Sequence, residues 1–293
     1  MSQYVTKIRT EAGDLQIDYN ALANLPTLSN PNLLINADFR SPINQRGQTI
    51  YTGGASKGYS IDRWCMGDND YERTVEVIDG GVKITNPNTT YIGTFQQIFE
   101  KTLPQGTYTV SVKVTAKTGS SIFSCAGSHG ATKKNLNVGV NTLTLTDATI
   151  DSVRIEVSSS SDITLEWVKL EAGATATPFT PAIYADELAM CRRYYQTISN
   201  YRCMLGVISS ENAYCAIPLS PTMRTAPSVS VVESDYIDIV SRTHVAPASI
   251  GKDGNYTNDK VVTLLAKKNS ESTFTAGQCL NCNVTAHFDA EIY

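Results

Sequence analysis

Carboxylates are the side chains of this sequence that come closest to a catalytic set. The stretch between positions 62 and 79 includes Asp62, Asp68, Asp70, Glu72 and Asp79. Glycoside hydrolysis needs only two carboxyl groups roughly 5–10 Å apart, and distant strands can supply them. Asp62, however, directly precedes Arg63 and Trp64 in a strand-like pattern, which favours a structural ion pair. Because no nucleophile elbow, phosphate loop or zinc-protease motif occurs, we expect no enzymatic activity and no catalytic residue.

The remaining candidates for metal or redox chemistry form no complete pattern. Three histidines lie in unrelated contexts, at His129, His244 and His287. Cys279 and Cys282 have the spacing of half a metal or redox site, but no second pair completes it. Asp68-Asn69-Asp70 has oxygen ligands for calcium, although a turn at this point needs no ion. We therefore expect no metal and no cofactor, and free buried thiols for the seven cysteines.

Tyrosines and asparagines in loop-like stretches give a better basis for binding than for catalysis. The chain has 15 tyrosines, and an exposed tyrosine offers a flat apolar face to a sugar ring and a hydroxyl for hydrogen bonding. The candidate ligand-binding residues are Tyr51, Tyr59, Tyr91, Tyr236, Asn255, Tyr256 and Asn258. The alternative for each tyrosine is a half-buried strand position. Trp64 and Trp167 lie in strand patterns and are predicted core residues.

Length and composition restrict the class of protein. The 293 residues suffice for two domains and a short appendage. Charged residues make up 18% and the net charge is -4, so nothing favours binding to nucleic acid or insertion at an anionic membrane. No apolar run approaches the ~20 residues of a membrane span. The first residues lack the apolar core of a signal peptide, so we expect the protein to stay in a cytoplasm or to be released by lysis.

Short strands must position the candidate residues in the first half of the chain. Residues 31–172 contain apolar runs separated by turn residues, with no strong helical period, which is typical of an antiparallel β-sandwich. In the clearest strand, Tyr108, Val110 and Val112 share one face. Two further runs, Leu33–Phe39 and Tyr59–Met66, are also predicted to be strands.

A linker and a second all-β unit follow. Residues 173–193 form the linker, and its part from Ala182 to Arg193 is predicted to be a helix, since acidic residues lie early in it and arginines late. Leu188, Cys191 and Tyr195 fall on one stripe of this helix and its continuation. We expect that stripe to face a neighbouring domain or subunit. Residues 194–293 again show alternating strands and are predicted to form a β-sandwich.

The first 30 residues are predicted to be an attachment segment. They alternate like a strand from Tyr4 to Arg9, have a turn signal at Gly13-Asp14, and have a capping residue at Asp18 for a short helix. A segment of this size cannot bury a core alone, so we expect it to dock on another subunit or to trimerise. The alternative is an arm that packs against its own domain.

Several stretches resemble tail-fibre and receptor-binding proteins of bacteriophages and prophages. They are Asn32-Leu33-Leu34-Ile35-Asn36, Ile43-Asn44-Gln45-Arg46-Gly47, Tyr59-Ser60-Ile61-Asp62-Arg63-Trp64, Trp167-Val168-Lys169-Leu170-Glu171, Thr175-Ala176-Thr177-Pro178-Phe179 and Cys191-Arg192-Arg193-Tyr194-Tyr195. The order of runs in residues 31–172 also resembles a jelly-roll carbohydrate-binding module. The resemblance implies an all-β chain with an N-terminal attachment segment, a jelly-roll-like sandwich, a short linking helix and a β-sandwich tip.

The same resemblance implies a role in host attachment. The expected protein is a homotrimer in the virion tail, made in the bacterial cytoplasm, that docks on other tail or baseplate proteins through residues 1–30. It would bind a host cell-surface polysaccharide without covalent chemistry. From its position in the chain, the C-terminal tip is favoured for this contact, with the loop 251–259 as the best candidate. Two alternatives stay open, a structural tail or head decoration protein with no host ligand, and a depolymerase that cleaves surface polysaccharide.

Overall fold

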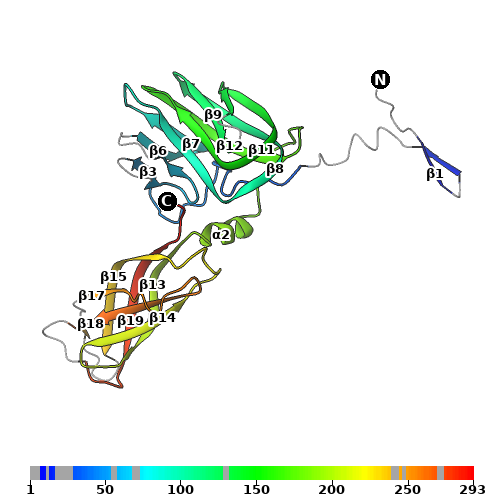
Figure 1. The fold of residues 1–293 in the computed structure, drawn as a ribbon. Helices are drawn as coiled ribbons and strands as arrows, with labels where there is room; N and C mark the ends of the chain where they lie inside the picture. Colours follow the sequence, from blue (N-terminus) through cyan, green and yellow to red (C-terminus); the bar gives the residue numbers. More distant parts are fainter. Residues whose placement is uncertain are drawn as a thin grey trace.

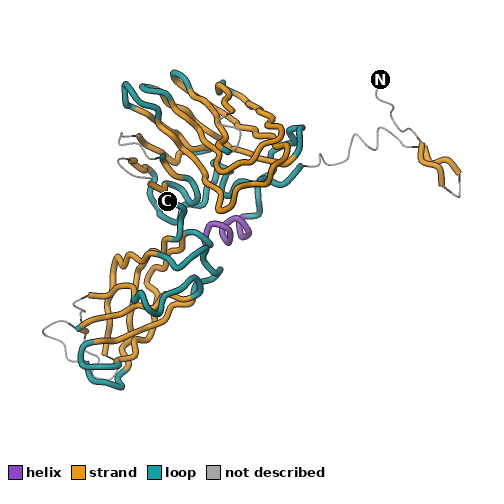
Figure 2. Tube along the Cα trace, in the orientation of Figure 1, coloured by secondary structure: helices purple, strands orange, loops and turns teal. Residues whose placement is uncertain are grey.

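A computed structural model describes residues 7–10, 13–16, 29–53, 58–67, 73–127, 132–238, 244–245, 249–268 and 274–293, with the backbone alone for the first two ranges and for 233–238 and 244–245. In this part of the chain, two β units are joined by one short helix (Figures 1 and 2). Every strand pairing in it is antiparallel, so the predicted all-β class is confirmed. The helix is not long and apolar enough to cross a bilayer.

The first unit is a sandwich of ten strands. They are β3 (Ile50–Gly53), β4 (Gly58–Tyr59), β5 (Cys65–Met66), β6 (Arg73–Ile78), β7 (Gly81–Asn86), β8 (Gly93–Thr118), β9 (Ser121–Ala126), β10 (Thr132–Asn135), β11 (Gly139–Val157) and β12 (Ser161–Ala172). The long β8 and β11 pair with each other, and their register shifts between Leu145 and Ser152. Such irregularities bend strands, so β8 and β11 contribute to both layers.

The two layers enclose one core. One layer joins β9, the end of β11, the start of β8 and β5, while the other runs from the start of β11 through β8, β12, β7 and β6 to β3. Inward positions alternate along β8, where Val110, Val112 and Val114 are buried as predicted. Trp64 is also fully buried and stacks on Phe95 with ring centroids 4.9 Å apart.

Two runs predicted to be single strands are not strands. Residues 33–39 lie beside β12 but turn at Asn36, which has a left-handed φ of 57° and fixes the turn with its amide, donating to Ile43 O and Asp62 O over 2.8 Å each. Residues 59–66 split into β4 and β5 around a tight turn. In both cases polar side chains satisfy backbone groups that a sheet would otherwise pair.

Helix α2 (Tyr184–Arg192) is shorter than the predicted 182–193. It starts after Ile183, whose φ and ψ are extended, and no side chain caps it. Asp186 and Glu187 lie in its first turn and Arg192 in its last, the charge order that the helix dipole favours. In Figure 1 this helix lies between the two β units.

The second unit is one seven-stranded antiparallel sheet. Its strands are β13 (Tyr195–Val207), β14 (Asn212–Pro218), β15 (Ser228–Asp238), β16 (His244–Val245), β17 (Ser249–Lys252), β18 (Val261–Lys267) and β19 (Cys279–Asp289), in the order β16-β15-β19-β13-β14-β18-β17. Strands β15 and β17, which lie on opposite sides of this order, are also in contact. The sheet therefore curls around a single core, which includes Leu205, Val262, Val284 and Phe288.

The strand directions place the loop 253–260 at the end of the second unit next to helix α2. Tyr195 at the start of β13 pairs with Asp289, and Met223 N donates to Asp259 O. Arg224 N donates in turn to Arg193 O, directly after the helix. The expectation that this loop forms the distal tip is wrong, because β18 starts at the end of the sheet where β13 also starts.

At the N-terminus the described backbone forms a hairpin. Strand β1 (Lys7–Thr10) pairs with β2 (Gly13–Gln16), and Thr10 lies opposite Gly13. The turn therefore comes before Gly13-Asp14, which was predicted to be the turn itself. The helix predicted after Asp18 lies outside the described residues.

Candidate functional site

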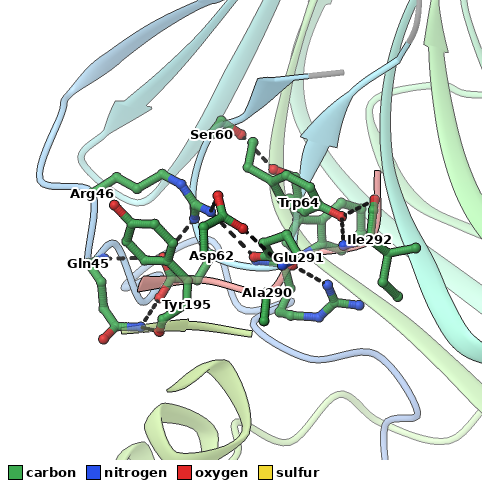
Figure 3. A network of polar contacts seen from close by, with 12 residues as sticks. Gln45, Arg46, Ser60, Asp62, Trp64, Tyr195, Ala290, Glu291 and Ile292 are labelled. Atoms are coloured by element: carbon green, nitrogen blue, oxygen red, sulfur yellow. Dashed lines mark hydrogen bonds and ion pairs between the residues drawn. The ribbon is translucent and has the colours of Figure 1, made fainter. Parts of the chain in front are cut away.

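The turn between β4 and β5 brings charged side chains to the contact between the two β units, here called the joint. Ser60 N donates to Trp64 O over 2.9 Å, and Trp64 N donates to Ile61 O over 3.1 Å. Arg63 adopts a left-handed φ of 70° within this turn. As a result Trp64 enters the core of the sandwich, whereas Asp62 lies at the joint (Figure 3). Arg63 also lies there, where it pairs with Glu291.

Four buried charges alternate across the joint. Arg46 Nη1 lies 3.2 Å from Asp62 Oδ1, and Arg63 pairs with Glu291 of the second unit. Arg46 Nη2 also approaches Glu291 Oε1, at 3.5 Å. The predicted structural ion pair of Asp62 is therefore present, with Arg46 as its partner, while the turn sends the neighbouring Arg63 to Glu291. Two arginines and two carboxylates balance, as buried charges require.

Burial changes the acidity of one of these groups. Removal from water raises the pKa of the Asp62 carboxyl to about 6, although Arg46 and the hydrogen bonds from Gln45 act in the opposite direction. The amide of Gln45 donates to Asp62 Oδ2 over 2.6 Å and to Tyr195 O over 2.7 Å, which links the two units. Asp62 is thus a structural carboxylate inside a hydrogen-bonded network.

Aromatic rings surround the Arg46 guanidinium. Its carbon lies 3.8 Å from the ring centroid of Tyr195 and 5.3 Å from that of Tyr59. The Tyr195 hydroxyl lies 2.7 Å from His287 Nδ1 on β19. This guanidinium keeps a fixed orientation, because its plane stacks on the aromatic rings while its N–H groups point at the carboxylates.

The last residues of the chain leave the second unit and contact the first sandwich. The Tyr59 hydroxyl donates to Ile292 O over 2.7 Å and accepts from Ile292 N over 3.1 Å. The Tyr59 and Tyr293 rings meet edge to face with centroids 5.5 Å apart. Arg224 Nε donates to Ala290 O over 2.9 Å. Residues 290–293 therefore act as a clasp, with the C-terminus beside the first sandwich in Figure 1.

A cavity of about 270 Å³ opens at the joint, here called the joint pocket. Its walls come from both units and include Arg46, Tyr51, Thr52, Tyr59, Tyr195 and His287. Aromatic surface with a few converging polar groups is typical of small-ligand sites. The volume is of the order of one sugar ring with its hydroxyls, since binding sites for whole drug-sized ligands start at roughly 300 Å³.

One hydrogen-bond donor at this pocket has no acceptor within the described residues. Arg46 Nη2 is buried and makes no hydrogen bond there; its carboxylate contacts to Glu291 and Asp289, at 3.5 and 4.0 Å, are longer than a hydrogen bond. An unsatisfied buried donor costs roughly 1–3 kcal/mol. Arg46 lines the joint pocket, but this nitrogen is closed off from solvent and faces the two carboxylates.

A larger cavity of about 670 Å³, here called the groove, lies beside helix α2. Its lining includes Pro31, Leu34, Phe179, Pro181 and Met190. Three polar groups around it already have partners within the protein: Asn32 Nδ2 donates to Val168 O, Asp38 accepts three hydrogen bonds from Arg40, and Glu187 accepts one from Asn36 N. The groove therefore offers mainly apolar surface.

A buried lysine fixes both walls of the groove. Lys169 Nζ donates to Ser29 Oγ over 2.9 Å, Thr177 Oγ1 over 2.6 Å and Pro178 O over 2.9 Å, and pairs with Glu171 at 3.2 Å. Beside it, the rings of Trp167 and Phe179 stack with centroids 4.7 Å apart. Trp167 is half-buried on the sandwich surface, so its predicted core position is wrong.

The predicted ligand-binding residues are divided among several places. Tyr51 and Tyr59 are buried, so the expectation of exposed rings is wrong for both, yet both line the joint pocket. Tyr91 is exposed on the first sandwich. Tyr256 is exposed on the loop beside helix α2. Neither residue lines the joint pocket. The side chain of Tyr236, on β15, lies outside the described residues.

The two asparagines predicted with Tyr256 contribute differently to their loop. Asn258 Oδ1 accepts from the backbone of Lys260 and Val261, an Asx-type turn that explains asparagine at this position without a ligand. Asn255 takes part through its backbone, since its N–H donates to Asp253 Oδ1. The Tyr256 ring meets Tyr214 edge to face, with centroids 6.5 Å apart.

The stripe predicted on the linking helix lies at the joint. Cys191 and Tyr195 are buried there, and Leu188 is partly buried. Arg46 and Glu291 were not identified as site residues from the sequence. Arg46 lies within one of the stretches that carry the phage resemblance, whereas Glu291 lies next to predicted strand residues and has no local pattern that separates it from an exposed carboxylate.

Within the described residues, no group of three or more His, Cys, Asp or Glu side chains is arranged to hold a metal ion. Most of the acidic stretch that raised the question of hydrolysis, with Asp68, Asp70 and Glu72, lies outside these residues, as does His129. Asp79 is exposed in the turn after β6.

Comparisons with known proteins give only distant likenesses. No family model and no curated protein matches the chain. The tandem CBM22-1-CBM22-2 domain of Xyn10C from Paenibacillus barcinonensis is 10% identical, covers 92% of this chain and 98% of its own, and has a TM-score of 0.27. Two structures of discoidin II from Dictyostelium discoideum have TM-scores of 0.19 and 0.22, at 10% and 12% identity; the first covers 77% of this chain and 84% of its own, the second all of both. At these TM-scores the likeness carries no argument about fold or ligand.

Proposed function

We propose that this protein is a non-catalytic attachment subunit of a phage tail fibre that binds a host cell-surface glycan in the joint pocket. The observation that carries the proposal is the convergence of three tyrosines, Tyr51, Tyr59 and Tyr195, with Arg46 and His287 around one cavity. Aromatic surface and directed donors are what a sugar needs, since its ring has apolar faces and its rim has hydroxyl groups.

The charge balance at the joint favours a neutral sugar. Arg46 is already paired with Asp62 and Glu291, so the pocket has little positive charge left for an anionic ligand. A carboxylated or sulfated sugar would bring a third negative group next to two buried ones, which is unfavourable.

The attachment role itself rests on the resemblance to phage tail fibres. In this proposal the protein is a homotrimer in the virion tail, made in the bacterial cytoplasm, and residues 1–30 dock on other tail or baseplate proteins. A pocket that holds one sugar ring binds weakly. Three copies on one fibre convert later contacts into intramolecular events, so avidity exceeds the single-site affinity by roughly 10²–10⁴-fold.

The test is calorimetric titration of the full chain with methyl glycosides of glucose, galactose and N-acetylglucosamine, followed by polysaccharides purified from bacterial cell walls. Thr52 is exposed on β3 at the pocket wall, so Thr52→Trp should block the pocket and weaken binding at least tenfold. Thr132→Trp, at an exposed position on β10 of the same sandwich, is the matched control and should bind like the wild type.

Three results would redirect the proposal. No binding of any probe by the folded wild-type chain would favour a structural tail or head decoration protein. Release of reducing sugar from the polysaccharide would favour a depolymerase. Equal binding by Thr52→Trp and Thr132→Trp would keep glycan binding but remove it from the joint pocket, and the exposed Tyr256 loop would become the next position to test.

A further inference from the structure

Three cysteines of the second β unit meet on the inner face of its sheet. Cys203 on β13 lies directly opposite Cys282 on β19 in the strand register. The register of β13 with β14 pairs Gly206 with Tyr214, which places Cys215 one diagonal step from Cys203. The Sγ atoms of Cys203 and Cys215 are 3.1 Å apart. Neighbouring strands therefore bring two sulfurs into contact that are 12 positions apart in the chain.

The environment gives the two sulfurs different roles. Cys203 is half-buried at the margin of the core, whereas Cys215 is buried. Hydrogen bonds from the thiols of Cys215 and Cys282 hold the pKa of Cys203 below its usual range. The hydrogen bond with Cys203, together with burial, raises the pKa of Cys215. Cys203 is thus the accessible sulfur that carries the negative charge, and the thiolate is the form that attacks a disulfide.

We propose that Cys203 and Cys215 form a reversible disulfide by exchange with a low-molecular-weight disulfide. The Cys203 thiolate attacks one sulfur of the oxidant, which breaks the oxidant's S–S bond and releases one thiolate. Cys215 then attacks the Cys203 sulfur of the mixed disulfide and releases the second thiolate, which takes up the Cys215 proton. The Cys203 thiolate and the Cys215 thiol are oxidised to the protein disulfide, and the oxidant disulfide is reduced to one thiolate and one thiol, so electrons and protons balance.

The Cys279-Cys282 pair, which has the spacing of a redox motif, is not an alternative. Residues three apart on a strand point to opposite faces of the sheet. Cys279 is accordingly exposed and Cys282 is buried, both on β19. Two other thiols, Cys125 and Cys191, are buried, and burial raises the pKa of both, to about 12 for Cys125, so they stay protonated.

The experiment uses the full reduced chain and oxidised glutathione as the probe. After incubation and alkylation, we expect intact mass spectrometry to show the loss of two alkylation sites out of seven cysteines. Peptide mapping should find the Cys203 peptide linked to the Cys215 peptide, and dithiothreitol should reverse the link. The cross-linked chain should also melt higher, by roughly 5 °C, because the unfolded state is constrained.

Matched variants separate this site from general thiol oxidation. Cys203→Ser and Cys215→Ser should each abolish the cross-link, whereas Cys279→Ser should leave it intact. A stable glutathione adduct on Cys203 with no cross-link would overturn the proposal, because it would mean that the Cys215 sulfur cannot attack the mixed disulfide on Cys203. A link that involves Cys279, or the same cross-link yield in chain denatured by guanidinium, would also overturn it, since neither depends on the folded geometry described above.

Discussion

The joint pocket and the groove lie near the same linking helix, but they use their polar groups in different ways. In the joint, Arg46, Asp62, Arg63 and Glu291 are buried and bind across two β units. Around the groove, Asn32, Asp38 and Glu187 are tied to nearby backbone or to a surface arginine. The larger cavity is therefore the less polar one. Volume and polarity therefore point to different cavities, and the proposed sugar site is the smaller and more polar of the two.

The joint and the groove are also stabilised by different interactions. The joint depends on buried charge, which is strongly destabilising when one partner is removed. The groove depends on apolar contact and on the Lys169 hydrogen bonds to its two walls. Substitutions at the joint should consequently change how the two units are held together, whereas substitutions on the groove surface should not.

The largest expected effect is that of Glu291→Ala. This change leaves Arg63, with only 2% of its side chain exposed, without its carboxylate partner. Removing one member of a buried pair typically costs about 3–5 kcal/mol. We expect that loss in the free energy of unfolding by chemical denaturation, and we expect the single calorimetric transition of the wild type to split as the two β units uncouple.

Two control variants test whether the stability loss in Glu291→Ala comes from the burial of the ion pair. Glu100→Ala removes the partner of Arg193 at the exposed margin of the joint and should cost at most about 1 kcal/mol. Met190→Ala removes an exposed groove side chain and should cost about 0.5 kcal/mol or less. If Glu291→Ala behaved like either control, the joint charges would not hold the units together.

The second prediction concerns pH. The pKa of Asp62 is about 6 in the folded protein, above its ordinary 3.8, so the folded state binds the proton more tightly. This contribution to stability is present below pH ~4 and is lost as the pH rises through ~6, a total of about 3 kcal/mol. Asp62→Asn does not titrate. The wild type should therefore lose about 3 kcal/mol relative to Asp62→Asn between pH ~4 and pH ~7.

The measurement is urea denaturation of both proteins across that pH range. Asp79→Asn, a change of the same chemistry at an exposed turn, serves as the control and should track the wild type at every pH. A constant difference in stability between the wild type and Asp62→Asn would mean that the buried carboxyl titrates as it does in the unfolded chain.

The smallest effect is expected for Tyr59→Phe. The change removes one hydroxyl that both donates to and accepts from Ile292, so the clasp loses its hydrogen bonds at a cost of about 1 kcal/mol. Hydrogen exchange should show faster exchange of the Ile292 amide. Tyr108→Phe removes a hydroxyl bonded to Pro104 O inside the first sandwich and should leave that amide unchanged. Equal protection of the Ile292 amide in both variants would mean that the Tyr59 hydroxyl does not hold the clasp in place.

Much of the fold could be predicted because it depends on local alternation. Val110, Val112 and Val114 follow the two-residue period of a strand and are buried together. The run 59–66 could not be predicted in the same way. Its residue types suit a strand, but Arg63 takes a left-handed conformation that is offset by tertiary contacts, with Glu291 among them.

For the joint pocket, the type of binding side chain could be predicted from the sequence, but its position in the fold could not. Tyrosine was identified as the binding side chain, but Tyr51 and Tyr59 were expected on exposed loops and are buried instead. The contact of His287 with the Tyr195 hydroxyl depends on the pairing of β13 with β19, which joins positions far apart in the chain. No spacing along the chain relates position 46 to position 291, so no sequence pattern indicates that their side chains meet.

The sequence by itself determined the all-β class, the linking helix with its dipole-matched charges, and the scarcity of catalytic patterns. These features depend on residues within a few positions of each other, where propensity and alternation act directly. The tertiary structure alone decided which buried charges pair, that the last four residues clasp the first sandwich, and that Cys203 meets Cys215. Such contacts join distant positions, and their partners are fixed by strand register and by the cost of leaving a buried polar group unpaired.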